Sequence, residues 1–315
     1  MKPCSIASVI SFCSHDWRFL EACIAGIKAN SSQIIVTTCD HLFNGEKENY
    51  ALLENAYLQF PNVLFLEFAY DPQKTYHYTN TLPASHPYIR RVWHNTGRWI
   101  SFYFLQETID YIHFCDADEV IDPSSFSSWL EKENLCSFSC VRFASSFYFR
   151  EAQYQAISDT MNGTLLVQKK ELQPSMLWNL KERMGIFNSL PGEKLLRVTD
   201  SEGNPFVHHY SWVKTKEELL KKTSSWAHYW EKNWQDLLEE EYARPFNGKD
   251  FIYKHRYKTV KPFFDPLSLK LPTSATLSLE DHLSFVKQLD NVIRIDQSAM
   301  FTQEIKKNFL ENRTL

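Results

Sequence analysis

The sequence predicts an α/β protein with a mostly parallel sheet flanked by helices and a helical extension at its C-terminal end. Residues 5–122 alternate between β-type apolar runs and segments whose apolar residues have helical spacing. Such alternation is typical of a parallel sheet built with right-handed crossovers. The apolar run at residues 111–115 then ends in four acidic residues within seven positions. Ligands of open α/β sheets bind beyond the carboxyl ends of strands, where this cluster would lie.

Each element of the first half has its own signal. The segment 13–16 is typical of a helix start, and Pro61 marks the end of the second helix. Asp122 and Pro123 read as a turn or helix cap leading into a helix at 126–131. The expected order is strand 5–12, helix 17–29, strand 33–39, helix 46–60, strand 62–68, a loop at 70–88, a helix from 90 to 108 and strand 111–115.

The second half has a different character. Aromatic residues are dense in its first strand, and paired histidines lie in its last. Thr215 and Glu218 have the spacing of a capping box at the start of the longest helical pattern. The expected elements are strands at 137–149, 163–168 and 204–212, a loop at 150–162, a long helix at 214–242 and a helical tail.

The acidic motif is the main candidate for a functional site. Carboxylates this close repel one another unless a cation lies between them. Asp116 and Asp118 would face the same side of an extended strand and could share one ion. Mg²⁺ and Mn²⁺ take oxygen ligands and commonly share a site with substrate phosphates. Glu119 would point away, which favours a structural role such as pairing with a base. The sequence therefore predicts a metal-assisted site for a phosphate-bearing ligand.

Composition and charge narrow the class of protein. The chain has 315 residues with a formal net charge of −4, which argues against nucleic acid as a partner. The seven cysteines include no Cys-x-x-Cys, so reduced thiols in a cytoplasmic protein are expected. No apolar stretch approaches the length of a membrane span. We expect a soluble, cytoplasmic protein, with peripheral contact at the inner face of a membrane as the alternative.

A tryptophan series in the expected long helix bears on that alternative. Trp226, Trp230 and Trp234 are spaced by four, which would place all three on one helix face. Such a face is usually part of the core. With the lysines nearby, it could instead lie against a membrane that carries a lipid-linked acceptor.

On these residues the sequence resembles glycosyltransferases of the GT-A fold, of the family 2 type, over residues 5–235. The resemblance rests on the opening segment 8–16, the helix at 19–27, the acidic motif and the segment 207–212. It implies transfer of a sugar from a nucleotide-diphosphate donor to a hydroxyl group of a glycan, lipid-linked or protein acceptor, with Mn²⁺ or Mg²⁺ and with inversion. We then expect a catalytic domain at 1–213, divided into a nucleotide-binding half (1–122) and an acceptor half (123–213). Residues 214–315 would form a helical extension packed on it.

The resemblance also implies roles for donor-binding residues. The first strand and its turn, with Ser11, would lie at the donor site. The turn after the second strand would contact the donor base through Asp40, although many family members have two acidic residues there. The segment that includes Asn95 and Arg98 is similar to the helix alongside the donor.

Metal ligands come mainly from the acidic motif. Asp118 is the expected direct ligand, and Asp116 would meet the ribose, or the metal through water. A neutral imidazole can complete such a site. Adjacent histidines of a strand face opposite sides, so one of His208 and His209 at most would take part. The resemblance favours His208.

Proton transfer and acceptor binding need further side chains. An inverting reaction needs a carboxylate that takes the proton of the acceptor hydroxyl. Glu182 is the first candidate, because Trp178 and Arg183 lie beside it and could stack on a sugar and steer an acidic group of the acceptor. Asp159 is the second candidate. Alternatively, Glu182 and Arg183 form an ordinary solvated charge pair.

Three other classes of protein compete with a glycosyltransferase. A nucleotidyltransferase that makes a nucleotide sugar would use a Gly-rich basic loop after the first strand, where this chain has Cys-Ser-His-Asp. A phosphatase with an Asp-x-Asp nucleophile would have that motif near its N-terminus. A degenerate GT-A fold could serve as a carbohydrate-binding module, against which the intact Asp116 and Asp118 pair argues.

Overall fold

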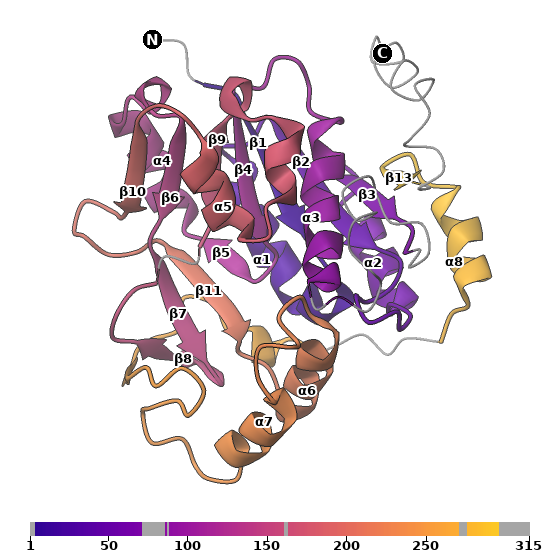
Figure 1. Cartoon of the computed structure of the whole chain (residues 1–315), viewed down its shortest axis with the longest axis vertical. Coiled ribbons are helices and arrows are strands. Elements are labelled where there is room, and N and C mark those ends of the chain that lie inside the picture. Colours follow the sequence, from indigo (N-terminus) through magenta and orange to yellow (C-terminus); the bar gives the residue numbers. More distant parts are fainter. Residues whose placement is uncertain (1–3, 71–85, 87, 161–162, 271–275, 296–315) are drawn as a thin grey trace.

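The computed structural model describes residues 4–70, 86, 88–160, 163–270 and 276–295, and its core is a large sheet with helices on both faces (Figure 1). The sheet has eight strands, in the order β10 (Lys194–Val198), β6 (Cys140–Phe143), β9 (Leu165–Gln168), β4 (Tyr111–Asp116), β1 (Ile6–Ser11), β2 (Gln33–Cys39), β3 (Leu64–Phe68) and β13 (Val292–Ile295). Its neighbouring strands are parallel except where β9 pairs with β4 and β6. The predicted α/β class with a mostly parallel sheet is confirmed.

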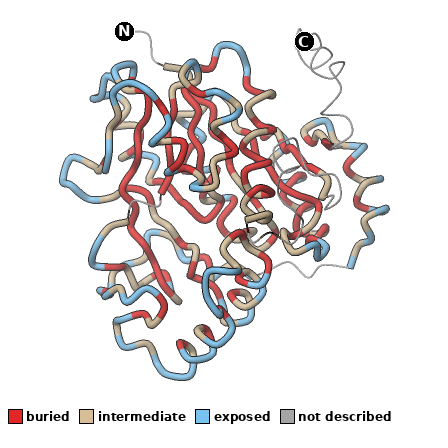
Figure 2. Tube along the Cα trace, in the orientation of Figure 1, coloured by how far each residue is buried: buried red, intermediate tan, exposed pale blue. Residues whose placement is uncertain are grey.

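Two hydrophobic clusters lie on opposite faces of this sheet. Side chains of β1 alternate between them: Ile6 and Ile10 belong to one cluster, and Ala7 and Val9 to the other. The central strands are therefore apolar on both faces, and most of their residues are buried (Figure 2). The first cluster includes helices α1 (Trp17–Lys28), α2 (Tyr50–Gln59), α4 (Pro123–Lys132) and α8 (Leu279–Val286), and the second α3 (Ile89–Phe102) and α5 (Glu182–Ser189).

A second sheet of five strands lies beside the first (Figure 1). One of its strands lies within the segment 150–162, where a loop is expected from the polar residues. These polar side chains lie on a partly exposed face of the sheet. Its strands, in order, are β12 (Tyr257–Thr259), β8 (Glu151–Ala156), β7 (Ser145–Phe149), β11 (Val207–Trp212) and β5 (Glu119–Ile121).

The expected long helix at 214–242 is two helices, α6 (Lys216–Ser225) and α7 (Trp234–Tyr242). Trp226 is the C-terminal cap of α6, and Trp234 opens α7. The two indoles pack with ring centroids 4.9 Å apart, because the chain between the helices folds back. The single tryptophan face predicted from the spacing of four is therefore wrong. In the described part of the chain, no helix has both the length and the apolar composition needed to cross a membrane.

Helix caps follow the sequence signals. The Asp122 side chain accepts hydrogen bonds from the N–H groups of Ser124 and Ser125 and so caps α4. Thr215 and Glu218 form the predicted capping box of α6. These contacts set where the two helices begin.

The C-terminal segment adds strands as well as helices. Among its described residues, 214–270 and 276–295, α6, α7 and α8 agree with the expected helical extension, but β12 joins the second sheet and β13 extends the first. Arg294 on β13 forms ion pairs with Asp40 and, at 2.5 Å, with Glu67 on β3. The tail at 296–315 and most of the expected loop at 70–88 lie outside the described residues. A domain boundary at residue 213 stays a prediction.

We expect Gly26→Ala to destabilise the protein. A Cβ at this position of α1 would clash with the backbone oxygen of Ile121 on β5 and lie 3.1 Å from its nitrogen. Alanine favours a helix by about 1 kcal/mol, but overpacking against backbone typically costs about 1–3 kcal/mol. Urea denaturation should show a net loss of unfolding free energy, whereas Ala25→Ser on the exposed face of α1 should change it by less than about 0.5 kcal/mol. A stabilised Gly26→Ala variant would contradict this close approach.

Candidate active site

The carboxyl ends of β1, β2 and β4 meet at a cavity of about 530 Å³. The chain runs outward from β1 through β2 and β3 and returns to β4 on the other side of β1. Ser11 and Asp116 are neighbours in the register where this reversal occurs. Ligands of open α/β sheets bind at such reversals, and the volume is within the range of small-molecule sites, about 300–1,000 Å³.

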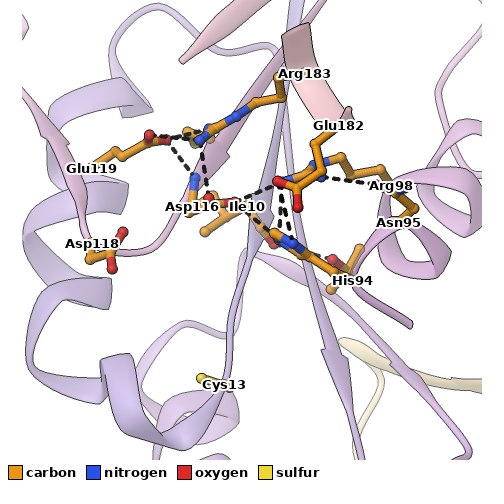
Figure 3. A network of polar contacts seen from close by, with 12 residues as sticks. Ile10, Cys13, His94, Asn95, Arg98, Asp116, Asp118, Glu119, Glu182 and Arg183 are labelled. Atoms are coloured by element: carbon orange, nitrogen blue, oxygen red, sulfur yellow. Dashed lines mark hydrogen bonds and ion pairs between the residues drawn. The ribbon is translucent and has the colours of Figure 1, made fainter. Parts of the chain in front are cut away.

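Asp116, the last residue of β4, has three basic side chains around its carboxylate (Figure 3). Arg98 donates to Oδ1 at 3.0 Å, and Arg183 donates to Oδ2 at 3.1 Å. His94 Nε2 lies 3.5 Å from Oδ1. Burial would raise the pKa of Asp116, but the guanidinium groups of Arg183 and Arg98 outweigh it and hold this pKa well below its usual range. Asp116 is therefore ionised, and the two arginines balance its negative charge.

Glu119 binds both Arg183 and the backbone of Asp116. Arg183 donates to both of its carboxylate oxygens, at 2.5 and 2.8 Å, and the Asp116 N–H donates to Oε2 at 2.8 Å. Glu119 is fully buried and pairs with a base, as the sequence predicts. Arg183, expected at the acceptor or in a solvated pair with Glu182, is instead buried against the acidic motif, because α5 begins beside the end of β4.

Asp118 has a separate set of partners. β4 ends at Asp116 and the chain turns at 117–118, so the extended geometry expected for the two aspartates does not hold. Lys222 of α6 donates to Asp118 Oδ2 at 2.9 Å, and His209 Nε2 lies 3.6 Å from Oδ1. Figure 3 shows Asp118 outside the contacts that surround Asp116.

A second lysine and aspartate lie next to this pair. Lys214 donates to Asp16 Oδ1 at 2.8 Å, and Lys222 Nζ lies 3.7 Å from the same oxygen. Burial would raise the pKa of Asp16, but Lys214 and Lys222 outweigh it and lower this pKa. Asp16 is thus ionised beside two lysines.

The structure places His209, rather than His208, at the cavity. His208 lies on the opposite side of β11, where its Nδ1 is 2.8 Å from the Tyr148 hydroxyl and its ring stacks on Phe263 at a centroid distance of 4.2 Å. Burial lowers the pKa of His208 to about 4, so it is neutral. The choice of His208 as a metal ligand was wrong because alternate residues of a strand face opposite sides and this strand presents His209.

Glu182, the first candidate for the base, lines the cavity between two histidines. His228 Nε2 lies 3.4 Å from Oε1, and His94 Nδ1 lies 3.8 Å from Oε2. Burial would raise the pKa of Glu182, but the interactions with His228 and His94 outweigh it and hold this pKa well below its usual range. The backbone of Glu182 has φ +50°, a strained conformation of the kind that clusters at functional sites. The carboxylate is therefore ionised and held in place.

The expected donor residues divide into two groups. Ser11 lines the cavity, and its Oγ is buried with no hydrogen-bond partner among the described residues. Asn95 and Arg98 are fully buried behind Asp116, where Arg98 donates to Asn95 Oδ1 at 3.2 Å. Asp40 is also buried, and it accepts a hydrogen bond from the Tyr70 N–H at 2.7 Å. These three residues hold the framework and do not line the cavity.

Two other expected site residues lie elsewhere. Trp178 is buried in the hydrophobic cluster behind the sheet, with its ring centroid 5.2 Å from that of Trp99, so it is a core residue and not an acceptor platform. Asp159 does not line the cavity and pairs with Arg197 at 2.6 Å. Both expectations rested on proximity in sequence to Glu182 or on residue type, and neither signal reports side-chain direction.

The donor set does not fit the expected Mn²⁺ or Mg²⁺ site. Asp116 faces two arginines and Asp118 faces Lys222, so a metal ion would have to displace fixed cations. Among the described residues, no group of three or more His, Cys, Asp and Glu side chains is arranged to hold a metal ion. Metal dependence stays a prediction.

Several residues of the site had no recognisable signal in the sequence. Lys222 and Asp118 are 104 positions apart, and His228 reaches Glu182 from the segment between α6 and α7. The sequence places Lys222 among the lysines near the tryptophans, which indicates an exposed charge. The pairing of Asp118 with Lys222 depends on how α6 packs against the sheet, and the sequence does not show this packing.

Comparisons with known proteins find distant similarity among solved structures. No protein-family model matches the chain, and no curated protein matches its sequence. Among solved structures, the chain is similar to a 4-diphosphocytidyl-2C-methyl-D-erythritol synthase from Anaerococcus prevotii (11% identity, 73% of this chain and 100% of that one, TM-score 0.43). It is also similar to the galactosyltransferase LgtC in complex with donor and acceptor sugar analogues (13%, 76% and 97%, TM-score 0.38). A third similar structure is GalNAc-T7 with UDP, GalNAc and Mn²⁺ (10%, 78% and 52%, TM-score 0.40). At these identities and TM-scores the similarity carries no argument about the fold or the activity of this chain.

Proposed function

We propose that the protein is a glycosyltransferase that moves a sugar from a nucleotide-diphosphate donor to a hydroxyl acceptor. The observation that carries the proposal is one cavity, at the carboxyl edge of the sheet, that combines cationic side chains with an ionised, buried carboxylate. The cations suit a diphosphate, and the carboxylate suits the proton of a hydroxyl group.

Arg183 and Lys222 both line the cavity and are the proposed phosphate-binding groups. Both are held by carboxylates, so their positions are fixed before a ligand arrives. Fixed cations stabilise negative charge that develops in a reaction without the cost of reorganising water. They would stabilise the diphosphate as it leaves the sugar.

Glu182, which also lines the cavity, is the proposed base. In the proposed reaction the acceptor oxygen forms a bond to the anomeric carbon while the bond from that carbon to the diphosphate oxygen breaks. The electron pair of the broken bond leaves with the diphosphate. The hydroxyl proton passes to Glu182, and attack on the face opposite the leaving group inverts the configuration.

The acceptor side is aromatic. Phe147, Trp226 and Tyr253 line the cavity, and Tyr253 is 38% exposed. Such rings give apolar faces on which a sugar ring can lie. They replace Trp178 as the proposed acceptor platform, and a glycan or the glycan part of a lipid-linked acceptor suits them.

Calorimetric titration with UDP, GDP and CMP tests the donor site. We expect one of the three to bind about tenfold tighter than the others, because a site that hydrogen-bonds one base rejects another. Asp159→Asn, outside the cavity lining, should bind that nucleotide as the wild type does. If none of the three bound, with EDTA or with Mn²⁺, the transferase proposal would fall and a carbohydrate-binding module would be favoured.

A further inference from the structure

We propose that the ammonium group of Lys222 takes the place of a divalent metal ion, so that the protein binds the donor diphosphate without metal. The inference rests on the proposed function and specifies how its phosphate site works. It starts from the mismatch between the expected metal ligands and the partners that they have.

Lys222 Nζ has the oxygen surroundings of a bound cation. It lies 2.9 Å from Asp118 Oδ2, 3.0 Å from Ser211 Oγ and 3.3 Å from the Ser211 backbone oxygen. A fourth oxygen, Asp16 Oδ1, is at 3.7 Å. These oxygens come from the turn after β4, from β11 and from the start of α1, so three separate elements converge on one ammonium group.

The charges around the ammonium are already balanced. Lys222 faces Asp118, and Lys214 faces Asp16. On the other side of the acidic motif, Arg98 and Arg183 face Asp116 and Glu119. A divalent ion beside Asp118 would therefore add two positive charges next to four carboxylates that already have four basic partners, and like charges at short range are unfavourable.

Lys222 is held as a cation and can reach a ligand. It pairs with the carboxylates of Asp118 and Asp16. Its side chain is 12% exposed and lines the cavity. An ammonium on a flexible stem is a common phosphate-binding group. Phosphate oxygens of the donor would take over hydrogen bonds that Asp118 and Ser211 accept in the free protein, which makes Asp118 a positioning residue.

Titration of three proteins in EDTA tests the inference, with whichever of the two diphosphates UDP and GDP binds the wild type. Wild-type affinity should be the same in EDTA and in Mn²⁺. Lys222→Met should weaken binding by about tenfold or more, the value of a hydrogen bond to a charged group. Lys221→Met is the matched control, because it removes an exposed charge from the same helix, and it should bind as the wild type does. Circular dichroism checks that each variant is folded.

Asp118→Asn separates the two explanations even if Lys222→Met does not fold. If Asp118 competes with the donor for Lys222, the variant should bind the nucleotide about two- to fivefold tighter in EDTA. If Asp118 is a metal ligand, the variant should lose Mn²⁺-dependent binding. Wild-type binding that falls more than about tenfold in EDTA and returns with Mn²⁺ would overturn the inference and leave the transferase standing. No nucleotide binding in any condition would overturn the proposed function, and the inference with it.

Discussion

Arg183→Met should lower the free energy of unfolding by about 3–5 kcal/mol and abolish nucleotide binding. Arg183 is the cation that Asp116 and the fully buried Glu119 share, at 2.5–3.1 Å. Without it, a buried carboxylate has no compensating charge, and removal of one partner of a buried ion pair typically costs this much. Urea denaturation followed by circular dichroism measures the loss.

Arg197→Met is the control for this effect. Arg197 also pairs with a carboxylate, that of Asp159, but its side chain is 54% exposed. Exposed pairs contribute about 0–1 kcal/mol, so this variant should stay within that range and keep its affinity for the nucleotide. An equal effect of the two substitutions would mean that the buried network does not stabilise the site.

Glu182→Gln should slow sugar transfer by about 10²–10⁴-fold while nucleotide affinity changes little. The substitution keeps the shape of the side chain but removes the only function proposed for it, which is to accept a proton. The measurement is release of nucleoside diphosphate from UDP-glucose, UDP-N-acetylglucosamine and GDP-mannose, at saturating donor, in parallel with calorimetric binding. The split between rate and affinity distinguishes a base from a residue that shapes the site.

Asp159→Asn is the matched control, since it was the other candidate base and lies outside the cavity lining. It should transfer at the wild-type rate. If it lost activity and Glu182→Gln did not, the role of base would pass to Asp159. The lowered pKa of Glu182 means that its carboxylate stays ionised at pH values where an ordinary glutamate, with a pKa of about 4.3, is half protonated. Acidification through that range should therefore not titrate the base.

The sequence predicts most strands of the first sheet but not which strands lie next to each other. Local patterns were sufficient for β1 to β4 and the helices between them, because each is a short element with its own periodicity. β8 was missed because its polar residues lie on a partly exposed face. The break between α6 and α7 was missed because helical spacing continues through residues 226–233, although tertiary packing turns the chain there.

The site shows the same limit. Asp116, Asp118 and Glu182 do line one cavity, as their residue types and positions after strands or at helix starts suggested. His208 and Trp178 do not, because side-chain direction depends on register and packing. Lys222 and His228 were not identified as site residues, because their importance comes from contacts with residues far away in the chain.

The position of β13 has a consequence for synthesis of the chain. β13 pairs in parallel with β3, and its Arg294, with His282 of α8, faces the buried Glu67. Until residues 282–295 have left the ribosome, the nascent sheet ends at β3 with an open edge, and Glu67 lacks both of its basic partners. Unpaired edges template aggregation, and domains generally fold from the N-terminal side during translation. Ribosome-bound chains that stop before β13 should therefore depend on chaperones that cover strand edges, whereas chains that include it should not.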